Sequence, residues 1–295
     1  PKNGLEAIWN HILRYRGEKI VREGGQAAPT ASGDYTYMGF DDQLLIPYGV
    51  KGVKASELQE TNILFKFKQK VTEPARLAGT ALLVHETMDQ IKTPRQAWTY
   101  NTGQRRVRRA PNVAYDAPGT ASDGLRTTDD FDMFNGAPNR YNWTLKGKQE
   151  LLIPYNDYRL HSDDLKYDQI LQPGHINPEL VRYEKHRVWV VEANLKSDTR
   201  HTYKKRVFYI DEDSWQVAVT DIYDNRDELY RVGVAHGINY YEVPTQWSTL
   251  EVFHDLQSRR YIAMGLDNEA NMYDFSADLQ DVDFTSSALR REGRR

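Results

Sequence analysis

Four consecutive strand-like runs in the second half of the chain constrain its fold more than any other feature. The links between these runs are polar and only three to five residues long. Runs of about nine residues joined by such short links are typical of an antiparallel meander. The runs are His186–Leu195, His201–Asp211, Trp215–Tyr223 and Glu228–His236. The first run carries apolar residues at consecutive positions, so we expect it to be buried on both faces.

A period of two also appears upstream, in the segment Ile63–Val71. Two phenylalanines and Val71 share one face, whereas three lysines share the other. This pattern predicts a half-buried antiparallel strand. Further strand candidates are Gly79–Glu86, Arg95–Tyr100, Arg105–Arg109, Tyr141–Pro154 and Tyr261–Gly265. A large, mostly antiparallel sheet with a few helices belongs to the α+β class.

The N-terminal segment has a helical period instead. Apolar residues at i, i+3, i+4, i+7 and i+8 from Leu5 to Leu13 predict a helix over Asn3–Arg16, which Asn3 caps. Residues 23–34 are rich in Gly, Ala, Pro, Ser and Thr, which predicts a loop. A second short helix is expected at Ala55–Glu60. We therefore expect one domain: helix and loops over 1–60, the sheet over 61–266 with a helix and loop insertion at 111–140, and a polar tail over 267–295.

Composition excludes several classes of protein. The 295 residues contain no cysteine, which excludes disulfides, thiolate metal sites and cysteine nucleophiles. The 39 basic and 42 acidic residues leave a formal charge of -3, and nucleic-acid-binding domains are clearly basic, so we expect no nucleic-acid partner. No apolar run approaches the ~20 residues of a membrane span. Because the chain starts with Pro1, we expect its numbering to begin downstream of the encoded start, after any signal peptide.

The usual catalytic signatures are missing, including the nucleophile elbow, the phosphate loop and the zinc-protease motif. No two of the eight histidines lie three or four residues apart. His85-Glu86 could seed an acid–base or metal site, but a strand histidine paired to a neighbouring carboxylate is the simpler interpretation. The acidic pair Asp129-Asp130 is typical of helix caps and solvated loops, and Asp211-Glu212-Asp213 is typical of a hairpin connection. We therefore predict no catalytic residue, no metal ligand and no cofactor.

Four arginines form the strongest charge cluster before the tail, at Arg105, Arg106, Arg108 and Arg109. They fit an anion-binding edge for phospholipid head groups, a lipid phosphate or an acidic partner. They also fit an edge strand that is kept charged to prevent pairing with another sheet. Both interpretations remain open.

Strand aromatics and aliphatics are the candidates for a ligand pocket. Core packing explains most of them, but a curved sheet with an aromatic concave face also lines pockets for apolar ligands. The candidates are Phe65, Phe67, Leu82, Val84, Trp98, Tyr100, Trp189, Val191, Phe208, Ile210, Trp215 and Val217.

Several longer motifs occur along nearly the whole chain. They are Asn3–His11, Leu13–Gly17, Ala97–Tyr100, Gln104–Pro111, Phe131–Gly136, Arg206–Trp215 and Ala288–Arg291. Together they resemble a bacterial family, domain-of-unknown-function family 1329 (DUF1329), which is placed near the LolA/LolB lipoprotein carriers.

The resemblance implies a strongly curved, unclosed half-barrel covered by helices, as in LolA and LolB. It implies a non-enzymatic periplasmic carrier of lipid, acyl chains or lipidated protein in a Gram-negative bacterium, with peripheral membrane contact. It leaves open attachment to the outer membrane through a segment outside this chain. A carrier predicts a cavity of several hundred Å³ with few ionisable groups.

Two alternatives remain beside the carrier. Family members are thought to accompany large export pumps, which implies an interaction module that binds inner-membrane pump and outer-membrane components through a sheet edge. The other is an unrecognised hydrolase, which requires two convergent carboxylates or His85 beside a second base.

Overall fold

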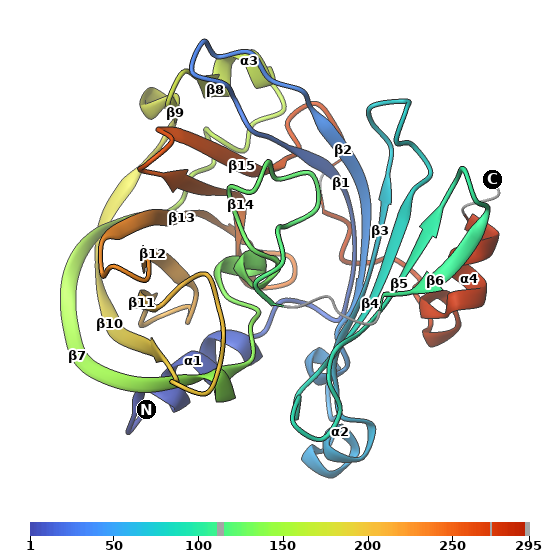
Figure 1. Cartoon of the computed structure of the whole chain (residues 1–295), viewed down its shortest axis with the longest axis horizontal. Coiled ribbons are helices and arrows are strands. Elements are labelled where there is room, and N and C mark those ends of the chain that lie inside the picture. Colours follow the sequence, from blue (N-terminus) through green and yellow to red (C-terminus); the bar gives the residue numbers. More distant parts are fainter. Residues whose placement is uncertain (111–114, 272, 293–295) are drawn as a thin grey trace.

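One antiparallel sheet of 13 strands runs through most of the part of the chain that the structure describes (Figure 1). The structure is a computed structural model that describes residues 1–110, 115–271 and 273–292. Residues 111–114 of the expected insertion, and 272 and 293–295 of the expected tail, therefore lie outside the described residues. The strand order is β6-β5-β4-β3-β2-β1-β15-β14-β13-β12-β11-β10-β7.

The predicted meander is confirmed in one half of this sheet, which curls strongly around a concave side (Figure 1). Each of its strands pairs antiparallel with its neighbours. The strands are β7 (Tyr141–Pro154), β10 (Tyr183–Leu195), β11 (Lys205–Asp211), β12 (Val217–Tyr223), β13 (Leu229–Tyr240), β14 (Thr245–Asp255) and β15 (Arg260–Leu266).

The other half holds the first six strands of the chain. They are β1 (Lys19–Ala27), β2 (Met38–Leu45), β3 (Ile63–Val71), β4 (Ala81–Thr87), β5 (Gln96–Asn101) and β6 (Arg106–Arg109). The expectation of helix and loops over 1–60 is wrong, because β1 and β2 lie in the middle of the sheet. The glycines that indicated a loop are required for close packing. A Cβ on Gly25 would lie 2.3 Å from the carbonyl oxygen of Met38.

The two halves meet where β1 pairs with β15. Three residue pairs define this junction, Gly25 with Leu266, Gln26 with Met264 and Ala27 with Ala263, and a bulge interrupts them. At the far ends of the sheet, β6 and β7 are both edge strands, so the barrel does not close.

Helix α1 (Gly4–Leu13) confirms the predicted N-terminal helix, although it ends three residues before Arg16. The Asn3 side chain accepts a hydrogen bond from the Glu6 amide at 2.9 Å, as expected of an N-cap. The helix α2 (Ala55–Thr61) is also present as predicted. The other short elements are α3 (Tyr167–Ile170), β8 (Leu171–Gln172), β9 (His175–Ile176), α4 (Ser286–Glu292) and the 3₁₀ turns at Pro47–Gly49, Thr128–Met133, Pro138–Arg140, Pro178–Leu180 and Asp281–Phe284.

The C-terminal segment is not the solvated tail that its composition indicates. Its helix α4 packs on the outer side of β4, β5 and β6, and Phe284 and Leu289 are fully buried there. Lys68 of β3 lies under this cover, and its Nζ donates to the carbonyl oxygen of Asp283 at 3.1 Å. The supposedly solvated lysine face of β3 is therefore covered at Lys68, which is 3% exposed.

Helix α1 and residues 115–140 lie on the concave side of the sheet, and we call them together the plug. In Figure 1 the plug lies between the two halves of the sheet. The main apolar core forms between the plug and the concave face, with Ile8 and Ile12 from the helix and Met133 and Phe134 from the insertion. The predicted short helix near 128–135 is a 3₁₀ turn broken at Asp132, whose φ is +52°. No helix among the described residues is long and apolar enough to cross a membrane.

Candidate functional site

Most of the predicted pocket residues gather on the concave face of the sheet. Seven belong to the main core, namely Phe65, Phe67, Val84, Val191, Phe208, Ile210 and Val217. Leu82, Trp189 and Trp215 are partly buried and pack against the same core. Their roles as ligand contacts stay predictions, but the structure brings these ten residues onto one continuous apolar surface.

Trp98 and Tyr100 do not belong to this surface. On β5 they pair with Leu83 and Ala81, which face the C-terminal segment. Side chains alternate between the two faces of a strand, so these aromatics point away from the concave side. Their assignment to the same cavity as the other ten is wrong, because Ala97 and not Trp98 lies beside Val84.

Aromatic side chains of the plug cover the apolar surface. The Phe131 ring lies 5.5 Å from that of Phe67, and the Phe134 ring lies 5.3 Å from that of Phe208. A ligand in the predicted position would have to displace these rings. The plug therefore fills the space in which the sequence predicts an apolar ligand.

The space left between the insertion and the middle of the sheet is small, and several charged side chains help to line it. A cavity of about 60 Å³ lies between the insertion and strands β1, β2, β14 and β15, and the twelve predicted pocket residues do not line it. Its lining includes Arg22, Asp42, Arg126, Asp132 and Glu251. The expectation of several hundred Å³ with few ionisable groups is therefore wrong for this arrangement of the plug.

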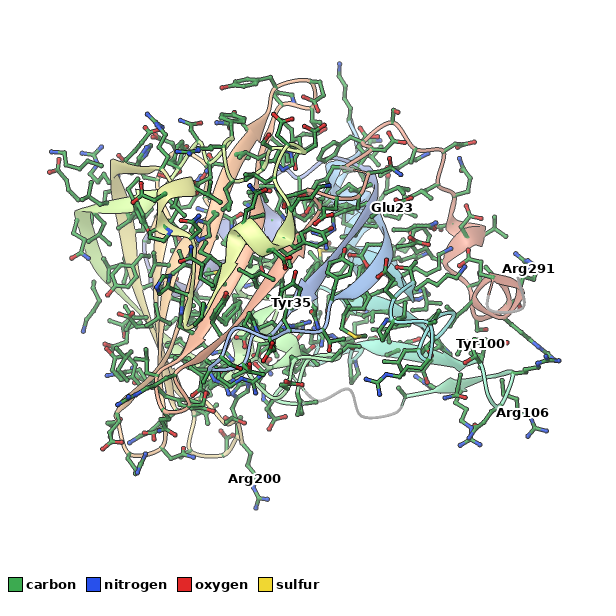
Figure 2. All side chains as sticks on the ribbon, turned by 90° about the horizontal axis from the view of Figure 1, so that it is seen from above. Glu23, Tyr35, Tyr100, Arg106, Arg200 and Arg291 are labelled. Atoms are coloured by element: carbon green, nitrogen blue, oxygen red, sulfur yellow. The ribbon has the colours of Figure 1, made fainter. Side chains whose placement is uncertain are left out.

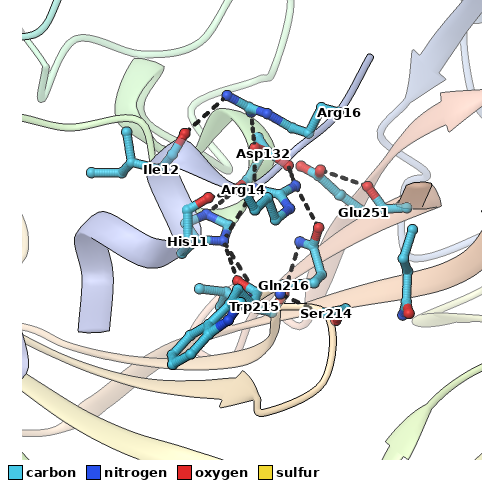
Figure 3. A network of polar contacts seen from close by, with 12 residues as sticks. His11, Ile12, Arg14, Arg16, Asp132, Ser214, Trp215, Gln216 and Glu251 are labelled. Atoms are coloured by element: carbon cyan, nitrogen blue, oxygen red, sulfur yellow. Dashed lines mark hydrogen bonds and ion pairs between the residues drawn. The ribbon is translucent and has the colours of Figure 1, made fainter. Parts of the chain in front are cut away.

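A buried carboxylate, Asp132, holds the two parts of the plug together (Figure 3). It pairs with both Arg14 and Arg16, and all three side chains are at most 4% exposed. Arg14 also donates to Gln216 at the start of β12. Burial alone would raise the pKa of Asp132, but the charges of Arg14 and Arg16 lower it to about 2. The carboxylate is therefore ionised at neutral pH.

His11 of α1 joins the same network (Figure 3) as a neutral group. Its Nδ1 accepts from the Val217 amide at 3.2 Å, so Nε2 carries the proton and donates to the carbonyl oxygen of Asp132 at 2.9 Å. Burial and the charge of Arg14 lower the pKa of His11 to about 3.

Glu251 of β14 lies beside this network in the small cavity. Its Oε1 accepts a hydrogen bond from the Ser248 hydroxyl at 2.8 Å. Burial and the nearby charge of Asp132 raise the pKa of Glu251 to about 7. A carboxyl group on the concave side therefore changes its charge near neutral pH.

A second set of buried acids fixes the insertion to the sheet. Asp129 contacts Arg206 at 2.7 Å and His201 at 3.1 Å. Burial raises the pKa of Asp129, but the charges of Arg206 and His201 outweigh this effect and lower it. Asp130 accepts a hydrogen bond from the Tyr203 hydroxyl at 2.8 Å.

The expectation of a solvated loop at Asp129-Asp130 is wrong, because both residues are at most 1% exposed. Asp130 does cap the 3₁₀ turn through the Thr127 amide, as the capping alternative predicts. The sequence does hint that these acids are buried, because they directly precede Phe131, Met133 and Phe134. Large apolar side chains are usually buried in the core, and residues next to them are carried inside as well.

The four predicted anion-binding arginines lie on or beside the edge strand β6. All four side chains are exposed and form no ion pair or hydrogen bond with residues that the structure describes. Figure 2 shows Arg106 and Arg291 of α4 at the same end of the molecule. Both interpretations of the cluster, anion binding and protection of the edge, are compatible with this position.

Among the described residues, no second base is hydrogen-bonded to His85. Its Nε2 lies 2.8 Å from the carbonyl oxygen of Phe284, and its ring packs against Trp98. Glu86 points to the other face of β4, where it binds Arg95 and Asn135. Adjacent residues of a strand face opposite sides of the sheet, so the side chains of His85 and Glu86 do not contact each other. They therefore form neither an acid–base pair nor a structural pair.

The family model of a protein of unknown function, DUF1329, matches residues 1–290. This chain belongs to the DUF1329 family. It is 53% identical over 296 residues to an uncharacterized protein of Pseudomonas aeruginosa, PA3922. The match covers 100% of this chain but only 65% of that curated relative.

Solved structures share the fold of this DUF1329 chain. A DUF1329 family protein from Desulfovibrio piger matches with a TM-score of 0.66 at 14% identity, over 97% of both chains. A domain from Vibrio parahaemolyticus, provisionally described as an outer membrane lipoprotein-sorting protein, matches with a TM-score of 0.66 at 15% identity, over 98% of both chains.

A LolA superfamily protein from Nitrosomonas europaea has a TM-score of 0.56 and 13% identity, covering 98% of this chain and 100% of that one. These matches confirm the predicted α+β fold, a mostly antiparallel, unclosed LolA-like sheet with few helices.

Proposed function

We propose that this DUF1329 chain is a non-enzymatic carrier whose concave face binds an acyl chain of a lipid or lipidated protein when the plug moves aside. One observation supports this proposal above the others. The apolar concave face is covered by a single helix and an irregular insertion, not by a second sheet. Irregular segments of this kind open more readily than paired strands.

The contacts of the plug suit a cover that opens reversibly. Its apolar rings contact the sheet, while ionised Asp129 attaches it to Arg206 of β11 through a specific ion pair. Opening would expose a surface made of Phe67, Val191 and Phe208, which matches the chemistry of a hydrocarbon chain. The ligand must offset the cost of breaking the ion pair. The measured Kd is therefore the Kd of the open form divided by the fraction of protein that is open.

We place this activity in the periplasm of a Gram-negative bacterium, with peripheral contact to a membrane. The Vibrio parahaemolyticus domain is provisionally described as an outer membrane lipoprotein-sorting protein, and its structure matches over 98% of this chain. Attachment to the outer membrane through a segment outside this chain is part of the same proposal.

Lipid binding is tested by native mass spectrometry of purified protein and by titration with a fluorescent fatty acid. Arg16→Gln loosens the plug while Arg14 still holds Asp132, and Arg226→Gln removes an exposed arginine that pairs only within its own turn. We expect bound lipid in the wild type and faster probe uptake in Arg16→Gln, with no change in Arg226→Gln. The carrier proposal fails if folded wild type and folded Arg16→Gln both bind no lipid and no probe.

The edge strand β6 favours a second function, an interaction module of an envelope export-pump complex. Its outer edge makes no backbone hydrogen bond to the described residues, and its exposed arginines have no acidic partner among them. An acidic segment of a pump component could add as a further strand and pair with these arginines.

This second function is tested with Arg106→Gln combined with Arg108→Gln. The matched control combines Arg200→Gln and Arg259→Gln, two exposed arginines in links between strands of the meander half, away from β6. Capture of envelope export proteins that is lost only in the β6 variant supports the module, and equal capture by both variants excludes it.

A further inference from the structure

Three side chains at one end of the meander converge on a common point. His186 comes from β10, Asp211 ends β11, and Asp213 lies in the turn that follows. The register places Asp211 beside Val188, so the histidine lies just beyond the end of the paired segment. Their candidate ligand atoms all lie within 4.8 Å of one another.

Among the described residues, Asp211 is a buried carboxylate without an arginine or lysine partner. It is 1% exposed, its Oδ2 accepts hydrogen bonds from the Ser214 amide at 2.9 Å and hydroxyl at 2.6 Å, and the Tyr155 side chain lies beside it. Its Oδ1 has no hydrogen-bond partner among the described residues. A buried charge without compensation is costly, so a ligand at Oδ1 is expected.

The neighbouring cations are already occupied. Lys148 and Arg187 pair with Glu212, and Arg182 pairs with Glu184. Among the described residues, Asp211 and Asp213 are left with His186 as their shared ion-pair partner.

A simple histidine–aspartate hydrogen bond does not explain this geometry. The His186 Nδ1 lies 3.4 Å from Asp211 Oδ1 and 4.0 Å from Asp213 Oδ2. No hydrogen bond joins the ring to Asp211, because Asp211 Oδ1 has no hydrogen-bond partner among the described residues. Two ligands bound to a tetrahedral metal at about 2.0–2.2 Å lie about 3.3–3.5 Å apart, which matches the histidine and Asp211. Asp213 is 73% exposed and can turn to complete the set.

The other ring nitrogen of His186 is oriented as in metal sites. Its Nε2 lies 3.4 Å from Glu184 Oε2, and the Asn156 amide donates to the other oxygen of Glu184 at 2.7 Å. A carboxylate on the distal nitrogen fixes the tautomer that leaves Nδ1 free as a ligand. The Tyr155 ring stacks on the imidazole at 3.9 Å and holds its plane.

We propose that His186, Asp211 and Asp213 bind a divalent transition-metal ion of the zinc type. One imidazole and two carboxylates suit such an ion, whereas calcium prefers oxygen ligands alone. The site borders a solvent-open groove of about 370 Å³ that Tyr155, Asp213 and Ser214 help to line, so water or a ligand of the metal can complete its coordination. This site differs from the expectation that no residue binds metal, and it does not depend on the carrier proposal.

The test is calorimetric titration of tag-free, chelator-treated protein with Zn²⁺ alone. We expect one ion per chain at this site, and an affinity lowered at least about tenfold in His186→Ala and in Asp213→Asn. Glu184→Gln tests the positioning residue and is expected to weaken binding by about tenfold. The controls are His175→Ala and Asp198→Asn, which alter an exposed histidine and an exposed turn aspartate elsewhere.

Asp213 is exposed, so its variant is expected to fold, and circular dichroism verifies this for each protein. Visible absorption of bound Co²⁺ gives a second readout, expected to change in His186→Ala and to stay the same in His175→Ala. The proposal is overturned if the wild type takes up no zinc, or if the ligand variants bind zinc as tightly as the controls.

Discussion

Arg14, just after helix α1, and Asp132, in the insertion, form a two-point ion pair although 118 residues separate them in the sequence. Arg16 joins the same carboxylate. These contacts tie the N-terminal helix to the mid-chain insertion. The plug therefore behaves as one unit, and its attachment can be tested separately from the stability of the sheet.

Asp132→Asn is expected to lower the free energy of unfolding by about 3–5 kcal/mol, because it leaves two buried guanidinium groups without their counter-charge. Urea denaturation measures the change. The control is Asp227→Asn, which breaks an exposed pair with Lys204 and is expected to cost at most about 1 kcal/mol. Similar losses in both variants would show that the buried network has no special role.

Glu251 gives the stability a defined pH dependence. Its pKa is 4.5 in the unfolded chain and about 7 in the folded protein, so the folded state binds the proton more tightly between these values. The stability from this group is present below about pH 4.5 and is lost as the pH rises through about 7.

Glu251→Gln removes this loss. From about pH 5 to about pH 8, its stability relative to wild type is expected to increase by about 1–3 kcal/mol. Chemical denaturation across this range measures the difference, with Glu228→Gln as the exposed control. A difference that does not change with pH would contradict the raised pKa.

Gly25→Ala tests the close approach of β1 and β2. Its Cβ would meet the Met38 carbonyl oxygen at 2.3 Å, and a backbone atom cannot move away cheaply. We expect a loss of about 1–3 kcal/mol in the free energy of unfolding. Gly103→Ala, at an exposed turn where the nearest atom is 3.3 Å away, is expected to change it by about 0.5 kcal/mol or less. Equal effects would argue against a steric reason for glycine in β1.

Leu289→Ala tests whether the C-terminal helix is part of the folded domain. Leu289 is fully buried against the outer face of the sheet, so its truncation is expected to cost about 2–5 kcal/mol. Thermal unfolding measures the loss, and Val282→Ala, which alters a residue 61% exposed, is the control. An unchanged melting temperature in Leu289→Ala would show that this segment contributes little to the stability of the domain and is held loosely.

The strands that alternate clearly could be predicted from the sequence. The structure gives β3 the predicted bounds, Ile63–Val71, and the four-strand meander follows the predicted order. Alternation fails where both faces are covered. β14 was not predicted because nearly every residue of Thr245–Asp255 is buried, which removes the period of two. The sequence does not predict β1, because its glycines, which allow close packing, are also typical of loops.

The candidate site could be predicted only in part, because it depends on contacts between distant segments. Ten of the twelve pocket residues share the concave face, but the sequence does not show that Phe131 and Phe134 cover it. Likewise, His186 and Asp211 are 25 positions apart in the sequence, and only the β10–β11 register places them together. Long-range register is the information that local patterns lack.

The junction between β1 and β15 determines when the sheet can become continuous while the chain is being synthesised. β1 is synthesised before every other strand that the structure describes, yet Gly25 pairs with Leu266, which follows 241 residues later. Until β15 arrives, this flank of β1 is an open edge that can pair with other chains. The sheet becomes continuous only once nearly all of these residues are available. A chain stopped before Arg260, where β15 begins, would therefore contain two separate sheets and one exposed, aggregation-prone strand.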